Sequence, residues 1–123
     1  MRHDQQQVRA YFQRRILECT RRERELAADD RGDEAVFARV QANVFQIFQT
    51  VFHRVMAMEN EKQAGALFLE KLAQIPQAWR DSYETASGYG KSDRMHLEAV
   101  KLETAAEIKS AFLRIWGDID DGG

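Results

Sequence analysis

Residues that break helices are scarce in this sequence, and their positions constrain the fold more than any other feature. The chain has one Pro and seven Gly among its 123 residues. Five of the seven Gly fall in polar stretches around 29–33 and 87–91 or at the C-terminal end. The alternation of apolar and polar residues that is typical of strands does not persist over any useful length. The long uninterrupted segments between the breaks therefore predict an all-α fold.

The positions of these helix-breaking residues predict four long helices in an antiparallel bundle. We place them at residues 4–28, 33–58, 60–85 and 92–116. Asp33 is a favourable N-cap for the second helix, and Asn60 followed by Gln63 fits a capping box for the third. The stretch 58–62 holds no strong breaker, so the second and third helices could also be continuous. We expect one domain over residues 1–117 and a short acidic tail at 118–123.

Pro76 lies inside the third predicted helix. The apolar stripe keeps helical spacing on both sides of it, through Ala64, Phe68, Leu72, Ile75, Trp79 and Tyr83. Proline lacks a backbone donor and disfavours helical dihedrals in the residue before it, here Ile75. We therefore expect a kink or a restart at Pro76, and a restart would make five helices.

The helix at 33–58 has a far wider apolar arc than a simple bundle requires. A stripe a little over ~100° wide is enough to face one core, whereas this arc covers roughly twice that. We expect it to be the central helix. The helix at 92–116 also has two apolar sides.

Two such helices carry more apolar surface than one small bundle easily covers, and large exposed apolar patches are uncommon on monomers. The pattern therefore predicts a homo-oligomer, in the form of a two-fold dimer, or contact with another protein. A monomer with the last helix wedged between the second and third is the alternative. The interface residues that we predict are Phe45, Phe52, Met56, Leu97, Ile108 and Ile115.

No combination of residues predicts catalysis, a metal site or a cofactor. His53 and His96 lie on polar helix faces, and Asp93-x-x-His96 lacks the second such motif and the inward-facing Glu residues of a metal bundle. Cys19 lies in an apolar stripe, where it acts as a small hydrophobe with no His placed to activate it. We therefore expect no enzyme.

The segment 88–92, Gly-Tyr-Gly-Lys-Ser, lacks the spacing of a phosphate-binding loop, and we interpret it as a hinge. Residues 1–28 are rich in Arg, but i, i+4 pairs such as Arg14–Glu18, Glu18–Arg22 and Arg21–Glu25 are expected to neutralise them. The net charge of -2 also argues against nucleic-acid binding.

A single Cys and the absence of an apolar stretch near residue 1 favour a reducing, cytoplasmic location. No run approaches the ~20 apolar residues of a membrane span. The sequence thus predicts a small helical protein that acts through protein–protein interaction or self-association. The alternative is a bundle that binds a small apolar ligand between the second and last helices, lined by Phe residues and by Met56, Met58 and Met95. Nucleic-acid binding through the first helix is a less favoured third hypothesis.

Overall fold

The computed structural model describes residues 3–58 and 60–117, and it is all-α over those residues. Its five helices are α1 (His3–Ala28), α2 (Gly32–Met58), α3 (Glu61–Gln74), α4 (Gln77–Gly88) and α5 (Ser92–Trp116). The predicted helical bundle is confirmed, with Pro76 dividing the third predicted helix in two. The predicted acidic tail, 118–123, lies outside the described residues.

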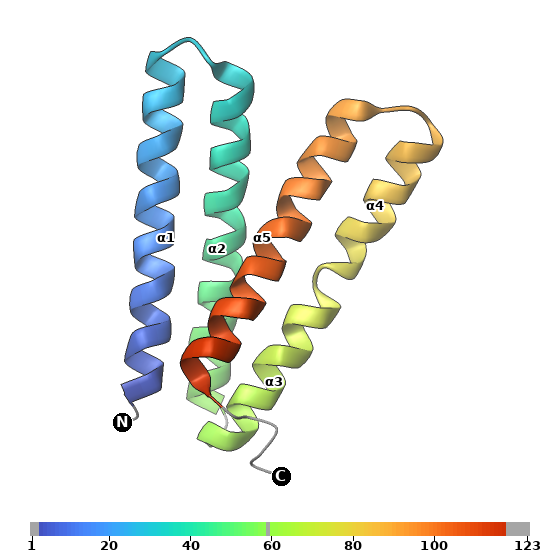
Figure 1. Cartoon of the computed structure of the whole chain (residues 1–123). Helices are drawn as coiled ribbons and strands as arrows, with labels where there is room; N and C mark the ends of the chain where they lie inside the picture. Colours follow the sequence, from blue (N-terminus) through green and yellow to red (C-terminus); the bar gives the residue numbers. More distant parts are fainter. Residues whose placement is uncertain (1–2, 59, 118–123) are drawn as a thin grey trace.

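The helices form two arms that meet along α2 and α5 (Figure 1). One arm is the α1–α2 hairpin. The other consists of α3 and α4, which run in succession, and of α5, which returns beside them (Figure 1). Helix α2 packs against α1, α3 and α5, and this confirms its expected central place. Helix α4 packs mainly against α5.

Asn60 separates α2 from α3. Its backbone is extended, and its side-chain Oδ1 accepts a hydrogen bond of 2.9 Å from the Gln63 backbone N–H. Its Nδ2 donates to Gln63 Oε1 at 3.2 Å. The capping interaction predicted for this pair therefore forms, and the two helices are not continuous.

The interruption at Pro76 differs in detail from the expectation. Ile75 keeps helical dihedrals, with φ -60° and ψ -43°, so it is not displaced from the helical region. The change comes at Pro76, where ψ is -7°. The Arg80 side chain donates a hydrogen bond of 3.2 Å to the Ala73 carbonyl beside the break. Pro76 is buried, so the bend belongs to the packed part of the molecule.

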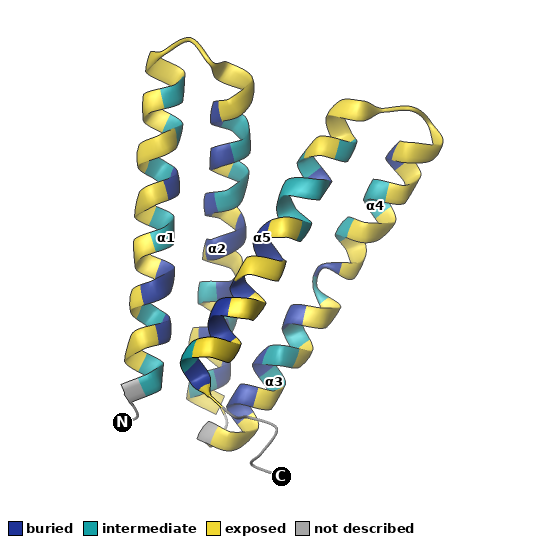
Figure 2. Ribbon diagram, in the orientation of Figure 1, coloured by how far each residue is buried: buried dark blue, intermediate teal, exposed yellow. Residues whose placement is uncertain are grey.

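The core is a cluster of aromatic rings between α1, α2, α3 and α5. Most pairs pack edge to face, which is the arrangement that ring quadrupoles favour. Figure 2 shows the buried residues concentrated where these four helices meet, whereas the two turns at the far end are exposed. The buried rings of the cluster belong to Tyr11, Phe12, Phe45, Phe48, Phe52, Phe68, Phe112 and Trp116.

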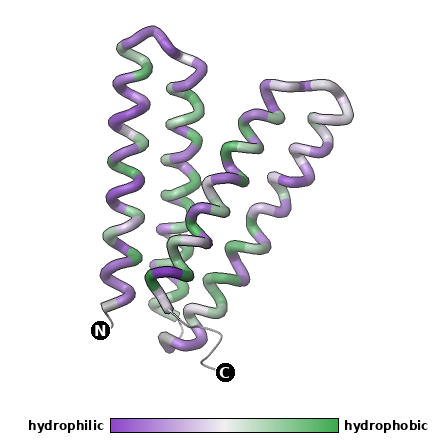
Figure 3. The backbone as a smooth tube through the Cα atoms, viewed as in Figure 1, coloured by the Kyte–Doolittle hydropathy of each residue, from purple (hydrophilic) through white to green (hydrophobic). Residues whose placement is uncertain are grey.

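Helix α1 is the most hydrophilic of the long helices (Figure 3). It contributes a narrow apolar stripe, with Val8, Phe12 and Cys19 buried and Ile16 and Leu26 partly exposed. The outer side of α1 therefore lies on the surface beside α2.

Candidate functional site

Half of the predicted interface residues are used inside the chain. Phe45, Phe52 and Ile108 are at most 1% exposed and belong to the core. They are not available to a partner in this structure, because other helices of the same chain cover them. Tyr11 and Arg15 of α1 lie against Phe45, and rings from α1, α3 and α5 surround Phe52. The other three, Met56, Leu97 and Ile115, are partly exposed.

The space predicted for an apolar ligand, between α2 and α5, holds packed side chains. The Phe52 ring meets the Phe112 ring there, at 6.2 Å between centroids, and Phe68 packs against both. Met56 and Met95 are partly exposed and Met58 is 71% exposed. The structure places hollows elsewhere, between α1 and α2 and beside Pro76.

The α1–α2 cleft has a volume of about 390 Å³. Its floor carries Phe12 from α1 and Phe52 from α2, two rings of the core. In a helix, the residues three positions before and one position after a buried residue lie beside it at the surface. The rim of the cleft therefore includes residues that flank Phe12 and Phe52 in this way. The lining residues are Arg9, Phe12, Gln13, Gln49, Thr50, Phe52, His53 and Arg54.

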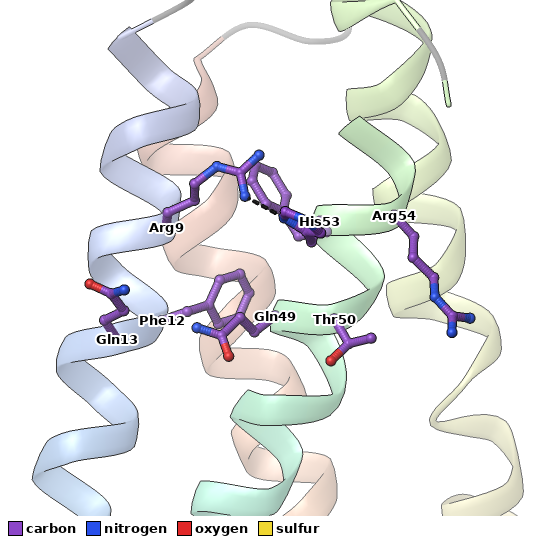
Figure 4. Close-up of a pocket in the computed structure, with 8 residues that line it drawn as sticks. Arg9, Phe12, Gln13, Gln49, Thr50, His53 and Arg54 are labelled. Atoms are coloured by element: carbon purple, nitrogen blue, oxygen red, sulfur yellow. Dashed lines mark hydrogen bonds between the residues drawn. The ribbon is translucent and has the colours of Figure 1, made fainter. Parts of the chain in front are cut away.

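Arg9 and His53 meet across the cleft. Arg9 Nη1 donates a hydrogen bond of 2.8 Å to His53 Nδ1 (Figure 4). Because Nδ1 accepts, the neutral ring carries its proton on Nε2 in this arrangement. The Arg9 guanidinium also lies 5.5 Å from the centroid of the Phe52 ring, which adds a cation–π contact. Two contacts therefore orient this guanidinium over the floor.

The cleft offers hydrogen-bond donors and positive charge, and none of its eight lining residues is Asp or Glu. Arg54 points away from Arg9 (Figure 4). Within residues 3–58 and 60–117, the side chains of Gln13, Gln49 and Thr50 make no hydrogen bond. The arrangement is suited to an anionic group, which accepts hydrogen bonds that these side chains can donate.

A second polar cluster joins α1 to α5, and its charges satisfy one another. Tyr11 donates to Glu107 Oε2 at 2.6 Å, and Arg15 pairs with the same carboxylate through Nε at 2.9 Å and Nη2 at 3.2 Å. Burial, together with Glu107, raises the pKa of Tyr11 well above its ordinary value. Because each group has its partner, we interpret this cluster as a link between helices rather than a binding site.

The ion pairs of α1 differ from those expected. Among the described residues, none of the three predicted i, i+4 pairs forms; Glu18 instead pairs with Arg15 at 2.8 Å, three residues away in the same helix. Arg15 also pairs with Glu107 on α5, and this contact could not be predicted from α1 alone. Cys19 is buried as predicted, and burial raises the pKa of its thiol.

Glu98 is a buried carboxylate between α4 and α5, only 2% exposed. Lys101 pairs with it at 2.8 Å, and the Arg94 guanidinium lies 3.9 Å away. Burial raises the pKa of Glu98, but hydrogen bonds from Lys101 and Ser82 and the two positive charges outweigh this effect. The net result is a pKa below the ordinary value of 4.5.

This lowered pKa predicts a pH-dependent contribution of Glu98 to stability. The ionised carboxylate stabilises the fold above pH 4.5, and the contribution is lost as the pH falls through the lower folded pKa. We expect Glu98→Gln to cost about 1 kcal/mol at roughly pH 7. Urea denaturation as a function of pH should show the difference from the unaltered protein closing in acid. Glu103→Gln, an exposed change on the same helix, is the control; a constant offset for Glu98→Gln at every pH would contradict the assignment.

In the part of the chain that the structure describes, no three His, Cys, Asp or Glu side chains are grouped so as to hold a metal ion. Nor does any helix described there have the length and apolar character needed to cross a membrane. No family model, curated protein or solved structure matches this chain.

Proposed function

We propose that this chain is an interaction module that binds an acidic segment of a partner protein in the α1–α2 cleft. The observation that carries the proposal is the composition of the cleft. It presents the Arg9 guanidinium, an imidazole, two amides and a hydroxyl around an aromatic floor, with Arg54 at its edge and no carboxylate among the eight lining residues.

Arg9 is the expected anchor for a carboxylate of the partner. A guanidinium has five N–H donors, so the hydrogen bond to His53 leaves others for a ligand. Gln13 and Gln49 are placed to bond the backbone of an extended segment, since amide side chains both donate and accept. The aromatic floor suits an apolar side chain next to the acidic one.

A protein partner fits the charge of the whole chain better than a nucleic acid does. The net charge is -2, and α1 interleaves acids with its Arg residues, so no extended basic surface follows the cleft. Two charge-assisted contacts contribute about 3–6 kcal/mol, less the cost of ordering a peptide, and this corresponds to a dissociation constant of about 0.1 mM or weaker. We therefore expect a weak, salt-sensitive interaction.

Fluorescence anisotropy with a labelled hexapeptide of alternating Asp and Leu tests this proposal. We expect saturable binding at low salt, and at least tenfold weaker binding when Asn replaces Asp in the peptide. Arg9→Ala should weaken binding by a similar factor, because it removes the oriented guanidinium. Arg39→Ala removes an exposed charge from α2 outside the cleft and should leave the affinity unchanged.

Two results would contradict the proposal. One is equal affinity for the Asp and Asn peptides, which would mean that no carboxylate is recognised. The other is an effect of Arg39→Ala as large as that of Arg9→Ala, which would mean that the peptide is attracted by surface charge in general and not by the cleft. Circular dichroism of each variant separates loss of binding from loss of folding.

Self-association is a second proposal, and partial exposure of apolar side chains near the end of α5 supports it. Leu113, near the end of α5, is 38% exposed. Light scattering across a concentration series should then give a mass above that of one chain. Leu113→Glu should return it to the monomer mass, since an exposed position tolerates the charge. A constant monomer mass up to high concentration would rule out a dimer through this face.

A further inference from the structure

A second hollow lies on another side of the molecule, where the bend between α3 and α4 faces α5. We call it the bend groove; its volume is about 370 Å³. Its walls are apolar, with Leu69 and Leu72 from α3, Pro76 at the bend and Leu102 from α5. Arg80 and Lys109 are the charged residues that line it, and both are positive.

The sequence produces this groove through Pro76 and through small side chains. The break at Pro76 interrupts the α3–α4 arm beside α5, and the residues opposite it on α5 are Ala105 and Ala106. Alanine fills little space, so the gap at the bend stays open. Leu72, Pro76 and Ala105 are buried, and they form an apolar floor.

Arg80 and Lys109 lie at the rim of the bend groove. Arg80 is fixed by its hydrogen bond of 3.2 Å to the Ala73 carbonyl, which keeps the guanidinium beside the groove. Lys109 is exposed on α5. Neither side chain pairs with a carboxylate within the described residues. An apolar trough with two positive charges at its edge is complementary to an amphiphile with a negative head.

We propose that the bend groove binds a medium-chain carboxylic acid. The alkyl chain lies along the leucine and alanine floor, and the carboxylate pairs with Lys109 and with the remaining donors of Arg80. The volume is at the low end of the ~300–1,000 Å³ range of small-molecule sites, which suits a chain of about eight carbons. This site is separate from the α1–α2 cleft, and the proposal does not depend on what the cleft binds.

A ligand series measured by nitrogen-15 NMR titration tests the proposal. We expect octanoate to shift amides around 69–76 and 102–109, with a submillimolar dissociation constant. Hexanoate should bind more weakly, by about three- to fourfold for each methylene removed. Octanol should bind at least tenfold more weakly than octanoate, because it lacks the charge.

Three variants distinguish the contribution of the ligand's carboxylate from that of its alkyl chain. Lys109→Ala should lower octanoate affinity toward that of octanol and leave octanol binding unchanged. Ala106→Leu, at an exposed position that tolerates a larger side chain, should block both ligands by filling the groove. Arg114→Ala removes an exposed charge from the same helix outside the groove and should change neither affinity.

The proposal fails if octanol binds as tightly as octanoate, or if Ala106→Leu leaves octanoate binding unchanged. It also fails if octanoate shifts the amides around Arg9 and His53 instead, which would place the carboxylate in the other cleft. Each of these outcomes is independent of the peptide experiment on the α1–α2 cleft.

Discussion

Replacing Phe68 by Ala is expected to destabilise the fold by about 3–5 kcal/mol. Phe68 is fully buried, and its ring lies 4.7 Å from that of Phe112 and 5.4 Å from that of Phe52, measured between centroids. It also meets the rings of Phe12 and Phe48. These rings come from α1, α2 and α5, so the cavity left by Ala would lie where all four core helices meet.

Urea denaturation followed by circular dichroism measures this loss. Since small domains have a total stability of roughly 5–15 kcal/mol, Phe68→Ala is expected to remove a large share of the free energy of unfolding. Phe68→Leu keeps an apolar side chain and should cost less than Phe68→Ala. Phe37→Ala, at a partly exposed position of α2, is a control for the loss of a ring outside the centre. A loss below about 1 kcal/mol for Phe68→Ala would contradict the packing described here.

Gly65→Ala is expected to destabilise the protein even though Ala is the better helix former. A Cβ at Gly65 would lie 2.5 Å from Trp116 Nε1 and 3.2 Å from the adjacent Cδ1, much closer than atoms in contact. Trp116 has little room to withdraw, because it is 5% exposed and stacks on Phe112 at 5.3 Å between centroids. Overpacking of this kind costs about 1–3 kcal/mol, which exceeds the helix gain of about 0.5–1 kcal/mol.

Gly88→Ala is the matched control for that experiment. Gly88 is also helical, but a Cβ there would meet no atom within 4 Å. The same substitution should therefore be neutral or slightly stabilising at 88 and destabilising at 65. The two midpoints of thermal unfolding should move in opposite directions or differ by several degrees, since about 1 kcal/mol shifts the midpoint of a domain this size by roughly 2–8 °C. Equal effects at both positions would contradict a close approach of α3 to Trp116.

Features that depend on local spacing could be predicted from the sequence. The Asn60 cap, the interruption at Pro76 and the burial of Cys19 each follow from one residue and its near neighbours. The central position of α2 could also be predicted, because a helix with a wide apolar arc must pack against neighbours on more than one side. These are properties of single helices.

Features that depend on the register between helices could not be predicted. The wide apolar arcs of α2 and α5 fit either an external partner or a monomer with the last helix wedged inward, and only the packed structure shows that helices of the same chain cover Phe45, Phe52 and Ile108. The α1–α2 cleft was missed for the same reason, since Arg9 and His53 are 44 positions apart and each lies on an ordinary polar face. Only the antiparallel register brings them to 2.8 Å.

The link between Tyr11 and Glu107 also has a consequence for how the protein is made. These residues are 96 positions apart, so α1 gains this contact only after α5 has left the ribosome. Until then the α1–α2 hairpin exists without the arm that covers its apolar side, and Phe52 lacks its contacts with Phe68, Phe112 and Trp116. The period of greatest exposure to aggregation is therefore set by the time needed to synthesise α3, α4 and α5, and slow codons in that stretch should lower the soluble yield.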